Sequence, residues 1–158
     1  MTDAPRIKPA PVRRSVFVKA SQEHAFEVFT AGFDRWWPRD HSIAGSPQKT
    51  AVMERKVGGR WYEVGEDGSE TQWGEVMVYE PPRRLVLIWQ VGADWKRDPI
   101  LHTEVEVTFT PEGDGVRVDL EHRMLEAFGE RAEDVIGAIG AEGGWSGLLK
   151  LFAAEAEQ

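Results

Sequence analysis

The sequence predicts an α+β fold, in which a curved antiparallel sheet of about seven strands wraps around a long C-terminal helix. Two patterns predict this arrangement. Residues 50–123 read almost wholly as strands and turns, and the clearest strands alternate between apolar and polar side chains, as in an antiparallel sheet with one wet face. Residues 131–156 instead carry apolar side chains at helical spacing. The dry face of the sheet needs a cover, and this segment is long enough to supply it.

The N-terminal part is expected to be a leader followed by a strand. Residues 1–11 carry three prolines and are predicted to form a flexible leader. A chain of 158 residues is typical of one domain, which we place at residues 12–156. Residues 13–19 alternate around Val16 and Val18 and are predicted to form the first strand.

Two short helices are predicted after this strand. Ser21 is a favourable N-cap for an amphipathic helix, and Gly32 ends that helix. Residues 33–38 are expected to form one further helical turn, which Pro38 closes because proline cannot continue a helix.

The strands that follow are separated by recognisable turns. The predicted strands cover residues 50–56, 60–64, 71–79, 84–91, 101–109 and 116–121. Asp67-Gly68 and Pro81-Pro82 are turn signals between them. In the helical segment beyond, glycines interrupt the apolar pattern, and a kink or break is predicted near Gly143-Gly144.

Composition and charge exclude several classes of function. The formal net charge of −8 argues against nucleic acid as the main partner, because phosphate binding needs clustered lysine and arginine. The absence of cysteine excludes disulfides, thiolate metal sites and cysteine nucleophiles. No run of about 20 apolar residues is present, so no membrane insertion is expected. The start of the sequence lacks the apolar core of a signal peptide, and the cytoplasm is the expected location.

Several stretches occur in the order and at the compact spacing of a known superfamily. They are Phe26-Glu27-Val28-Phe29 running to Trp36-Trp37-Pro38, Gly58-Gly59-Arg60-Trp61-Tyr62-Glu63, Trp73-Gly74-Glu75-Val76 through Pro81-Pro82 to Trp89, Glu104-Val105 to Phe109, and Gly144-Trp145 with Leu148-Leu149. Together they resemble the START-like (SRPBCC) superfamily of helix-grip domains, which includes the birch-pollen-allergen-like proteins. Within it, the chain is similar to the branch named for activators of the 90-kDa heat-shock protein ATPase.

This resemblance implies a helix-grip fold and a range of functions. Members of the superfamily bind lipids, sterols, polyketides or plant hormones, a few catalyse cyclisations or hydrolyses, and one branch stimulates the chaperone ATPase. The fold alone does not select among these activities.

Seven tryptophans, distributed over nearly every predicted element, indicate either a thick aromatic core or the wall of an apolar pocket. We interpret them as a pocket between the sheet and the C-terminal helix. The predicted ligand-binding residues are Phe29, Phe33, Trp36, Trp37, Tyr62, Trp89, His122, Trp145, Leu149 and Phe152. Because two adjacent tryptophans do not easily both point inward, one of Trp36 and Trp37 is expected to face the pocket mouth or solvent. A gating role at the entrance is an open alternative for His41.

No catalytic or metal-binding residue is predicted. The chain contains neither an H-E-x-x-H nor a G-x-S-x-G motif, and no cofactor is expected. Glu63 and Glu75 each lie two residues beyond a tryptophan in neighbouring strands, so the two glutamates are expected to share a face. We expect that face to be outward and solvated; an inward face would instead raise the pKa of at least one carboxyl.

The function predicted from the sequence is therefore binding of a small, largely hydrophobic molecule. The first alternative is a protein-interaction or co-chaperone-like module that stimulates a heat-shock ATPase. The second is a cyclase or hydrolase that uses Glu63, Glu75 or His122. The expected partners are a small hydrophobic molecule, lipids among the candidates, and a chaperone under the first alternative, with the chain acting as a monomer or a homodimer.

Overall fold

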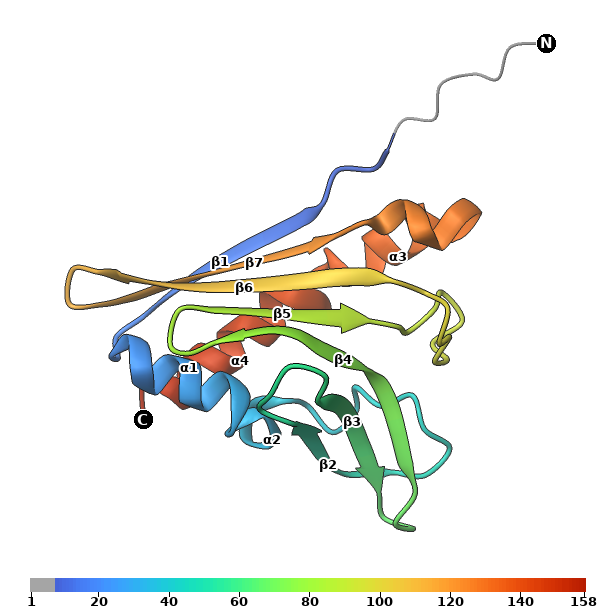
Figure 1. Ribbon diagram of the computed structural model, residues 1–158, viewed down its shortest axis with the longest axis horizontal. Helices are drawn as coiled ribbons and strands as arrows, with labels where there is room; N and C mark the ends of the chain where they lie inside the picture. Colours follow the sequence, from blue (N-terminus) through green and yellow to red (C-terminus); the bar gives the residue numbers. More distant parts are fainter. Residues whose placement is uncertain (1–7) are drawn as a thin grey trace.

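The computed structural model describes residues 8–158, so most of the predicted leader lies outside the described residues. One antiparallel sheet contains the strands β1 (Val12–Val18), β2 (Gln48–Met53), β3 (Arg60–Gly65), β4 (Glu70–Glu80), β5 (Arg84–Trp89), β6 (Thr103–Glu112) and β7 (Gly115–Arg123). Their order across the sheet is β1-β7-β6-β5-β4-β3-β2, so the last strand pairs with the first. Two short helices come after β1 and the C-terminal helical segment comes after β7, as the sequence predicts. Figure 1 shows the predicted helix-grip arrangement, with α4 (Gly147–Ala156) lying against the curved sheet.

The two short helices after β1 are α1 (Gln22–Thr30) and α2 (Phe33–Trp36). Ser21 caps α1 as predicted, because its side chain accepts a hydrogen bond from the backbone N–H of His24. The buried side of α1 meets α4 through Phe29 and Phe152, whose ring centroids are 5.2 Å apart in an edge-on arrangement. The core therefore lies between the sheet on one side and α1, α2 and α4 on the other.

The predicted break in the C-terminal helical segment is confirmed. A 3₁₀ segment (Leu125–Arg131) leads into α3 (Ala132–Ile139), and a π-helical turn (Glu142–Ser146) separates α3 from α4. Gly144 has non-helical backbone angles within that turn, and a Cβ there would lie 2.2 Å from the carbonyl oxygen of Ile139. Glycine is required at this close approach, which redirects the chain before α4 begins.

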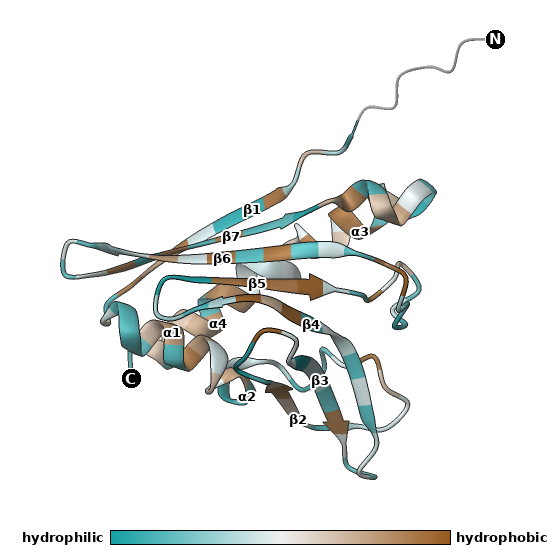
Figure 2. Ribbon diagram, viewed as in Figure 1, coloured by the Kyte–Doolittle hydropathy of each residue, from teal (hydrophilic) through white to brown (hydrophobic). Residues whose placement is uncertain are grey.

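The alternation predicted for β6 and β7 is also confirmed, and Figure 2 shows it as alternating hydrophobic and hydrophilic colours along β6. Val105, Val107 and Phe109 are buried, whereas the outer face carries Glu104 and Glu106. Both carboxylates form ion pairs with arginines on neighbouring strands. Oε1 of Glu104 lies 3.0 Å from Nη2 of Arg123, and Oε1 of Glu106 lies 2.5 Å from Nη1 of the same arginine. Oε2 of Glu106 lies 2.5 Å from Nε of Arg84. The outer face of the sheet is thus a ladder of ion pairs, and the inner face supplies the core.

A bulge in β4 decides which side chains of this strand reach the core. Trp61 of β3 pairs with Gly74 whereas the next residue pairs with Gln72, so Trp73 is an extra residue in β4. As a result Trp73 and Val76 both point inward although they are three residues apart. A Cβ on Gly74 would lie only 1.7 Å from the carbonyl oxygen of Ile88, so glycine allows the close approach of β5 at the bulge.

Gly74→Ala is expected to lower the free energy of unfolding by at least about 2 kcal/mol, because the new methyl group forces β4 and β5 apart. Urea denaturation measures this change. The matched control is Gly137→Ala in α3, where no atom lies within 4 Å of the added Cβ. That substitution is expected to stabilise the protein by up to about 1 kcal/mol, since alanine is the better helix former. Equal effects of the two substitutions would contradict the bulge argument.

Candidate functional site: a tryptophan-walled pocket

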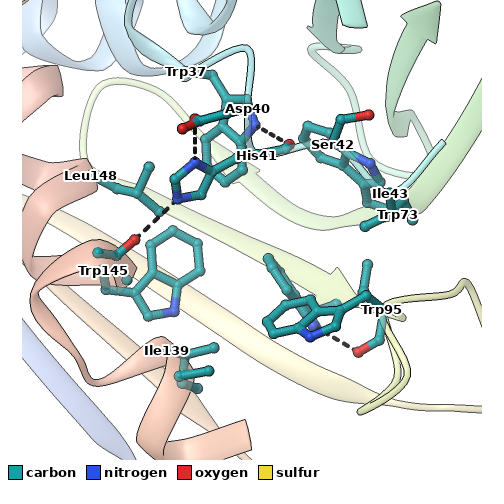
Figure 3. A pocket seen from close by; sticks show the side chains of 15 residues that line it. Trp37, Asp40, His41, Ser42, Ile43, Trp73, Trp95, Ile139, Trp145 and Leu148 are labelled. Carbon is teal, nitrogen blue, oxygen red and sulfur yellow. Dashed lines mark hydrogen bonds and ion pairs between the residues drawn. The ribbon is translucent and has the colours of Figure 1, made fainter. Parts of the chain in front are cut away.

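A cavity of about 350 Å³ opens between one end of the sheet, the break between α3 and α4, and two loops. The loops are the α2–β2 loop (residues 37–47) and the β5–β6 loop (residues 90–102). The lining residues are Trp37, Asp40, His41, Ser42, Ile43, Trp73, Trp89, Val91, Trp95, Ala138, Ile139, Gly143, Gly144, Trp145 and Leu148. Figure 3 shows how these side chains converge from elements far apart in the sequence.

Trp61 is fully buried and supports three of the tryptophans that line this pocket. Its ring centroid lies 5.4 Å from that of Trp73, 5.5 Å from that of Trp89 and 6.4 Å from that of Trp37, all in edge-on geometry. Its Nε1–H is, within residues 8–158, the one buried side-chain polar atom that lacks a hydrogen-bond partner. The pocket wall is therefore a packed layer of indoles.

Of the residues predicted to bind ligand, Trp37, Trp89 and Trp145 line the pocket. The other buried apolar members lie behind it in the core, and so does the buried His122; the apolar members are Phe29, Phe33, Trp36, Leu149 and Phe152. One of the two adjacent tryptophans was expected to face the pocket mouth or solvent: Trp37 lines the pocket, but neither indole faces solvent, since Trp36 and Trp37 are only 4% and 6% exposed. Both fit because α2 ends between them, and each indole N–H finds a carbonyl, that of Val28 for Trp36 and that of His41 for Trp37.

The structure places Tyr62 away from the pocket. It occupies the outer face of β3, where the guanidinium carbon of Arg60 lies 4.2 Å from the centre of its ring. The alternation along β3 explains this position, because Trp61 and Glu63 on either side of Tyr62 point inward.

The inward position of Glu63 corrects a second expectation. Glu63 is fully buried, whereas Glu75 is exposed, so the two glutamates do not share a face. The bulge at Trp73 and Gly74 is the reason, since it reverses the alternation of β4 between Trp73 and Glu75. The signal for the inward position of Glu63 was Trp61, because side chains two residues apart on a regular strand share a face and the indole of Trp61 is buried.

The buried carboxylate of Glu63 is surrounded by hydrogen-bond donors. Oε1 accepts from the backbone N–H of Ile43 at 2.8 Å and from Nε1–H of Trp73 at 3.0 Å. Oε2 accepts from the hydroxyl of Ser42 at 2.5 Å and from the side-chain amide of Gln48 at 3.4 Å. Sequence reasoning identified neither Ser42 nor Gln48. One side chain of β3 thus fastens the α2–β2 loop to the sheet and orients an indole of the pocket wall.

His122 performs a similar task on the other side of the pocket. It is fully buried on β7, and its Nδ1 accepts from Nε1–H of Trp145 at 3.2 Å. The proton must therefore be on Nε2, which donates to Oγ1 of Thr103 at 2.9 Å, and this hydroxyl donates to the carbonyl of Trp89 at 3.0 Å. Burial lowers the pKa of His122 to about 3, so the imidazole is neutral at ordinary pH. A neutral histidine thereby holds Trp145 in the pocket wall.

His41 and Asp40 form the polar edge of the pocket. Nδ1 of His41 lies 3.0 Å from Oδ1 of Asp40, and Nε2 lies 3.0 Å from the carbonyl oxygen of Gly143 (Figure 3). The hydrogen bond from His41 lowers the pKa of the Asp40 carboxyl. His41 therefore bridges the α2–β2 loop to the helix break at the rim of the pocket. Within residues 8–158, no three histidine, aspartate or glutamate side chains are grouped as a metal ion would need.

The chain is similar to known proteins in both sequence and fold. The family model of activator of Hsp90 ATPase homolog 1-like proteins matches residues 19–157. No curated protein matches the chain. Among solved structures, the anthrahydroquino-γ-pyrone synthase Txn09 complexed with SUM is 37% identical, with a TM-score of 0.65 over 93% of this chain and 97% of that chain. CalC from Micromonospora echinospora, a self-sacrificing resistance protein, is 32% identical, with a TM-score of 0.70 over 93% and 94%. The Aha1 dimer from Colwellia psychrerythraea is 17% identical, with a TM-score of 0.62 over 94% and 97%.

Glu63→Leu is expected to lower the free energy of unfolding by about 3 kcal/mol or more, because the N–H groups of Ile43 and Trp73 lose their acceptor inside the protein. Glu75→Leu is the matched control on the exposed side of the same sheet, with an expected change within about 0.5 kcal/mol. Urea denaturation of both variants checks the difference, and a mild effect of Glu63→Leu would show that its hydrogen bonds contribute little.

His122 is expected to make the protein less stable in acid. Its pKa of about 3 in the folded state is below the ordinary histidine value, so below about pH 6.5 the unfolded chain binds a proton that the folded chain does not. The contribution of His122 to the free energy of unfolding is thus fully present above that pH and decreases as the pH falls toward 3. Between pH 6.5 and 5 the loss from this residue is at most about 2 kcal/mol. In urea denaturation His122→Asn, which cannot titrate, should show that much less pH dependence; an unchanged slope would contradict the assignment.

Proposed function

Because the chain belongs to the family of activator of Hsp90 ATPase homolog 1-like proteins, we propose that it is a ligand-binding module whose pocket takes a small, flat and largely apolar molecule. The resemblance seen in the sequence is confirmed by the family match and the solved relatives. The observation that carries the proposal is the pocket itself, which five tryptophans line. Flat and rigid indole faces suit flat ligands, which can stack on them over a large area.

The charges around the pocket support an uncharged ligand. The described lining residues include the carboxylate of Asp40 but neither a lysine nor an arginine. The formal net charge of the whole chain is −8. An anionic ligand such as a fatty acid would lose its hydration without gaining a counter-ion. The carboxylate of Asp40 at the polar edge can accept a hydrogen bond from a ligand hydroxyl instead.

The two alternatives have less support at this site. The interaction hypothesis relied on the family likeness and on an exposed member of the Trp36-Trp37 pair; the family match stands, but both of these side chains are buried. The Aha1 dimer is 17% identical to this chain, and at that identity the likeness supports a shared fold but not a shared activity. The enzyme hypothesis needs a free base in the pocket, but both oxygens of Glu63 and both ring nitrogens of His122 already have protein partners, and Glu75 is exposed outside the pocket. Binding is therefore the function we infer first.

The location of the protein in the cell and its oligomeric state are known only as predictions from the sequence. No helix within residues 8–158 is both long enough and apolar enough to cross a membrane. The cytoplasmic location, the choice between monomer and homodimer, and a chaperone partner remain predictions.

Isothermal titration calorimetry with neutral flat molecules, 1-hydroxyanthraquinone and flavone, tests the proposed function. We expect both to bind and palmitate to bind at least about tenfold more weakly, because the lining offers no counter-ion. Trp145→Leu should weaken the flat ligands about tenfold by removing a stacking surface. Tyr62→Leu on the outer face is the control and should bind like the wild type. Failure of the wild type to bind either flat molecule, or a preference for palmitate, would refute the proposal.

A further inference from the structure

Trp95 in the β5–β6 loop has a backbone conformation that bulky residues rarely adopt. Its φ angle is 60°, in the left-handed region that favours glycine, and its side chain is 48% exposed. Both features cost stability, since the first strains the backbone and the second leaves a large apolar surface in water. A residue that is unfavourable in two ways calls for a reason outside the stability of the fold.

The loop holds Trp95 in this conformation through a tight turn. The N–H of Gly92 donates to the carbonyl of Lys96 at 2.8 Å, and the N–H of Trp95 donates to the carbonyl of Gly92 at 2.9 Å. The side chain of Asp94 accepts from the N–H of Lys96 at 3.2 Å, which fixes the tip of the turn. The turn determines the direction in which the indole leaves the backbone, and that direction takes it to the pocket.

Packing within the protein does not account for this indole. Within residues 8–158, Trp95 takes part in none of the ring pairs that connect the other six tryptophans, and its Nε1–H has no hydrogen-bond acceptor. Figure 3 shows Trp95 and Trp145 on opposite sides of the pocket, one coming from the β5–β6 loop and the other from the helix break. Trp95 and Trp145 therefore line a common space between the β5–β6 loop and the helix break.

We propose that Trp95 is the outer half of an aromatic clamp, which covers one face of a flat, fused-ring ligand while Trp145 and its neighbours support the other face. This inference rests on the proposed function and adds to it a residue that selects ligands by their thickness. A planar ring system can contact two opposed indoles at once. A puckered ring system of similar size cannot lie flush against both, so it gains less from Trp95.

The test compares a flat neutral probe, 1-hydroxyanthraquinone, with a puckered neutral probe, testosterone, in isothermal titration calorimetry. The variants are Trp95→Ala and Trp95→Gly, both of which remove the indole. The control is Ile100→Gly, which removes a 90% exposed apolar side chain from the same loop but not from the pocket. We expect both Trp95 variants to bind the flat probe about tenfold more weakly and testosterone less than about twofold more weakly. Ile100→Gly should bind both like the wild type.

Thermal denaturation supplies a second readout that does not need a ligand. Trp95→Gly is expected to melt at a higher temperature than Trp95→Ala, because glycine accepts a φ of 60° and alanine keeps the strain. The two variants should nevertheless bind the flat probe equally weakly. This combination separates a binding role from a structural one.

The outcomes distinguish the clamp from the proposed function. If the wild type binds the flat probe and both Trp95 variants bind it equally well, the clamp is refuted while ligand binding stands. If the variants lose both probes to the same extent, the selection of flat ligands is refuted. If the wild type binds neither probe, the proposed function is refuted and the clamp with it.

Discussion

The buried carboxylate of Glu63 is the interaction on which the pocket depends. A charged group inside a protein is costly unless hydrogen bonds replace its hydration, and this one has four donors around it. Two of those donors, at Ser42 and Ile43, belong to the α2–β2 loop, and a third is the indole of Trp73. Because the same loop continues from Trp37 through His41, a single side chain determines where one entire wall of the pocket stands.

The seven tryptophans divide into three groups by what surrounds them. Trp36 belongs to the core with α1 and α4, and Trp61 supports the pocket wall from behind. The remaining five line the pocket, but they are held differently. Side chains or carbonyls bind the indole N–H groups of Trp37, Trp73, Trp89 and Trp145, so their orientation is set before a ligand arrives, whereas the N–H of Trp95 is unpaired within residues 8–158. Preorganised walls reduce the entropy lost on binding.

The sequence predicted the features that depend on local pattern. Alternation located the two faces of β6 and β7, and clustered glycine located the break between α3 and α4, since both signals lie in consecutive residues. The facing of Glu75 was harder to predict, because a one-residue bulge reverses the alternation of β4 and nothing in the composition of β4 marks it clearly. Glu63 and Tyr62 follow the regular alternation of β3, so their facing depends on which way Trp61 points. The loop residues His41, Ser42 and Trp95 reach the pocket only through tertiary contacts, which a periodic pattern does not encode.

The strand and helix side chains that line the pocket differ in physical character from the two loops at its rim. The strand and helix side chains include Trp73 and Trp145, whose indole N–H groups are bound by Glu63 and His122, so a substitution there is expected to lower stability as well as ligand binding. The rim consists of two loops, with Trp95 on one and His41 on the other. Since Trp95 is half-exposed and outside the core, it can change without unfolding the protein. Ligand choice within this architecture is therefore expected to depend on the loops, while the sheet and α4 keep the space open.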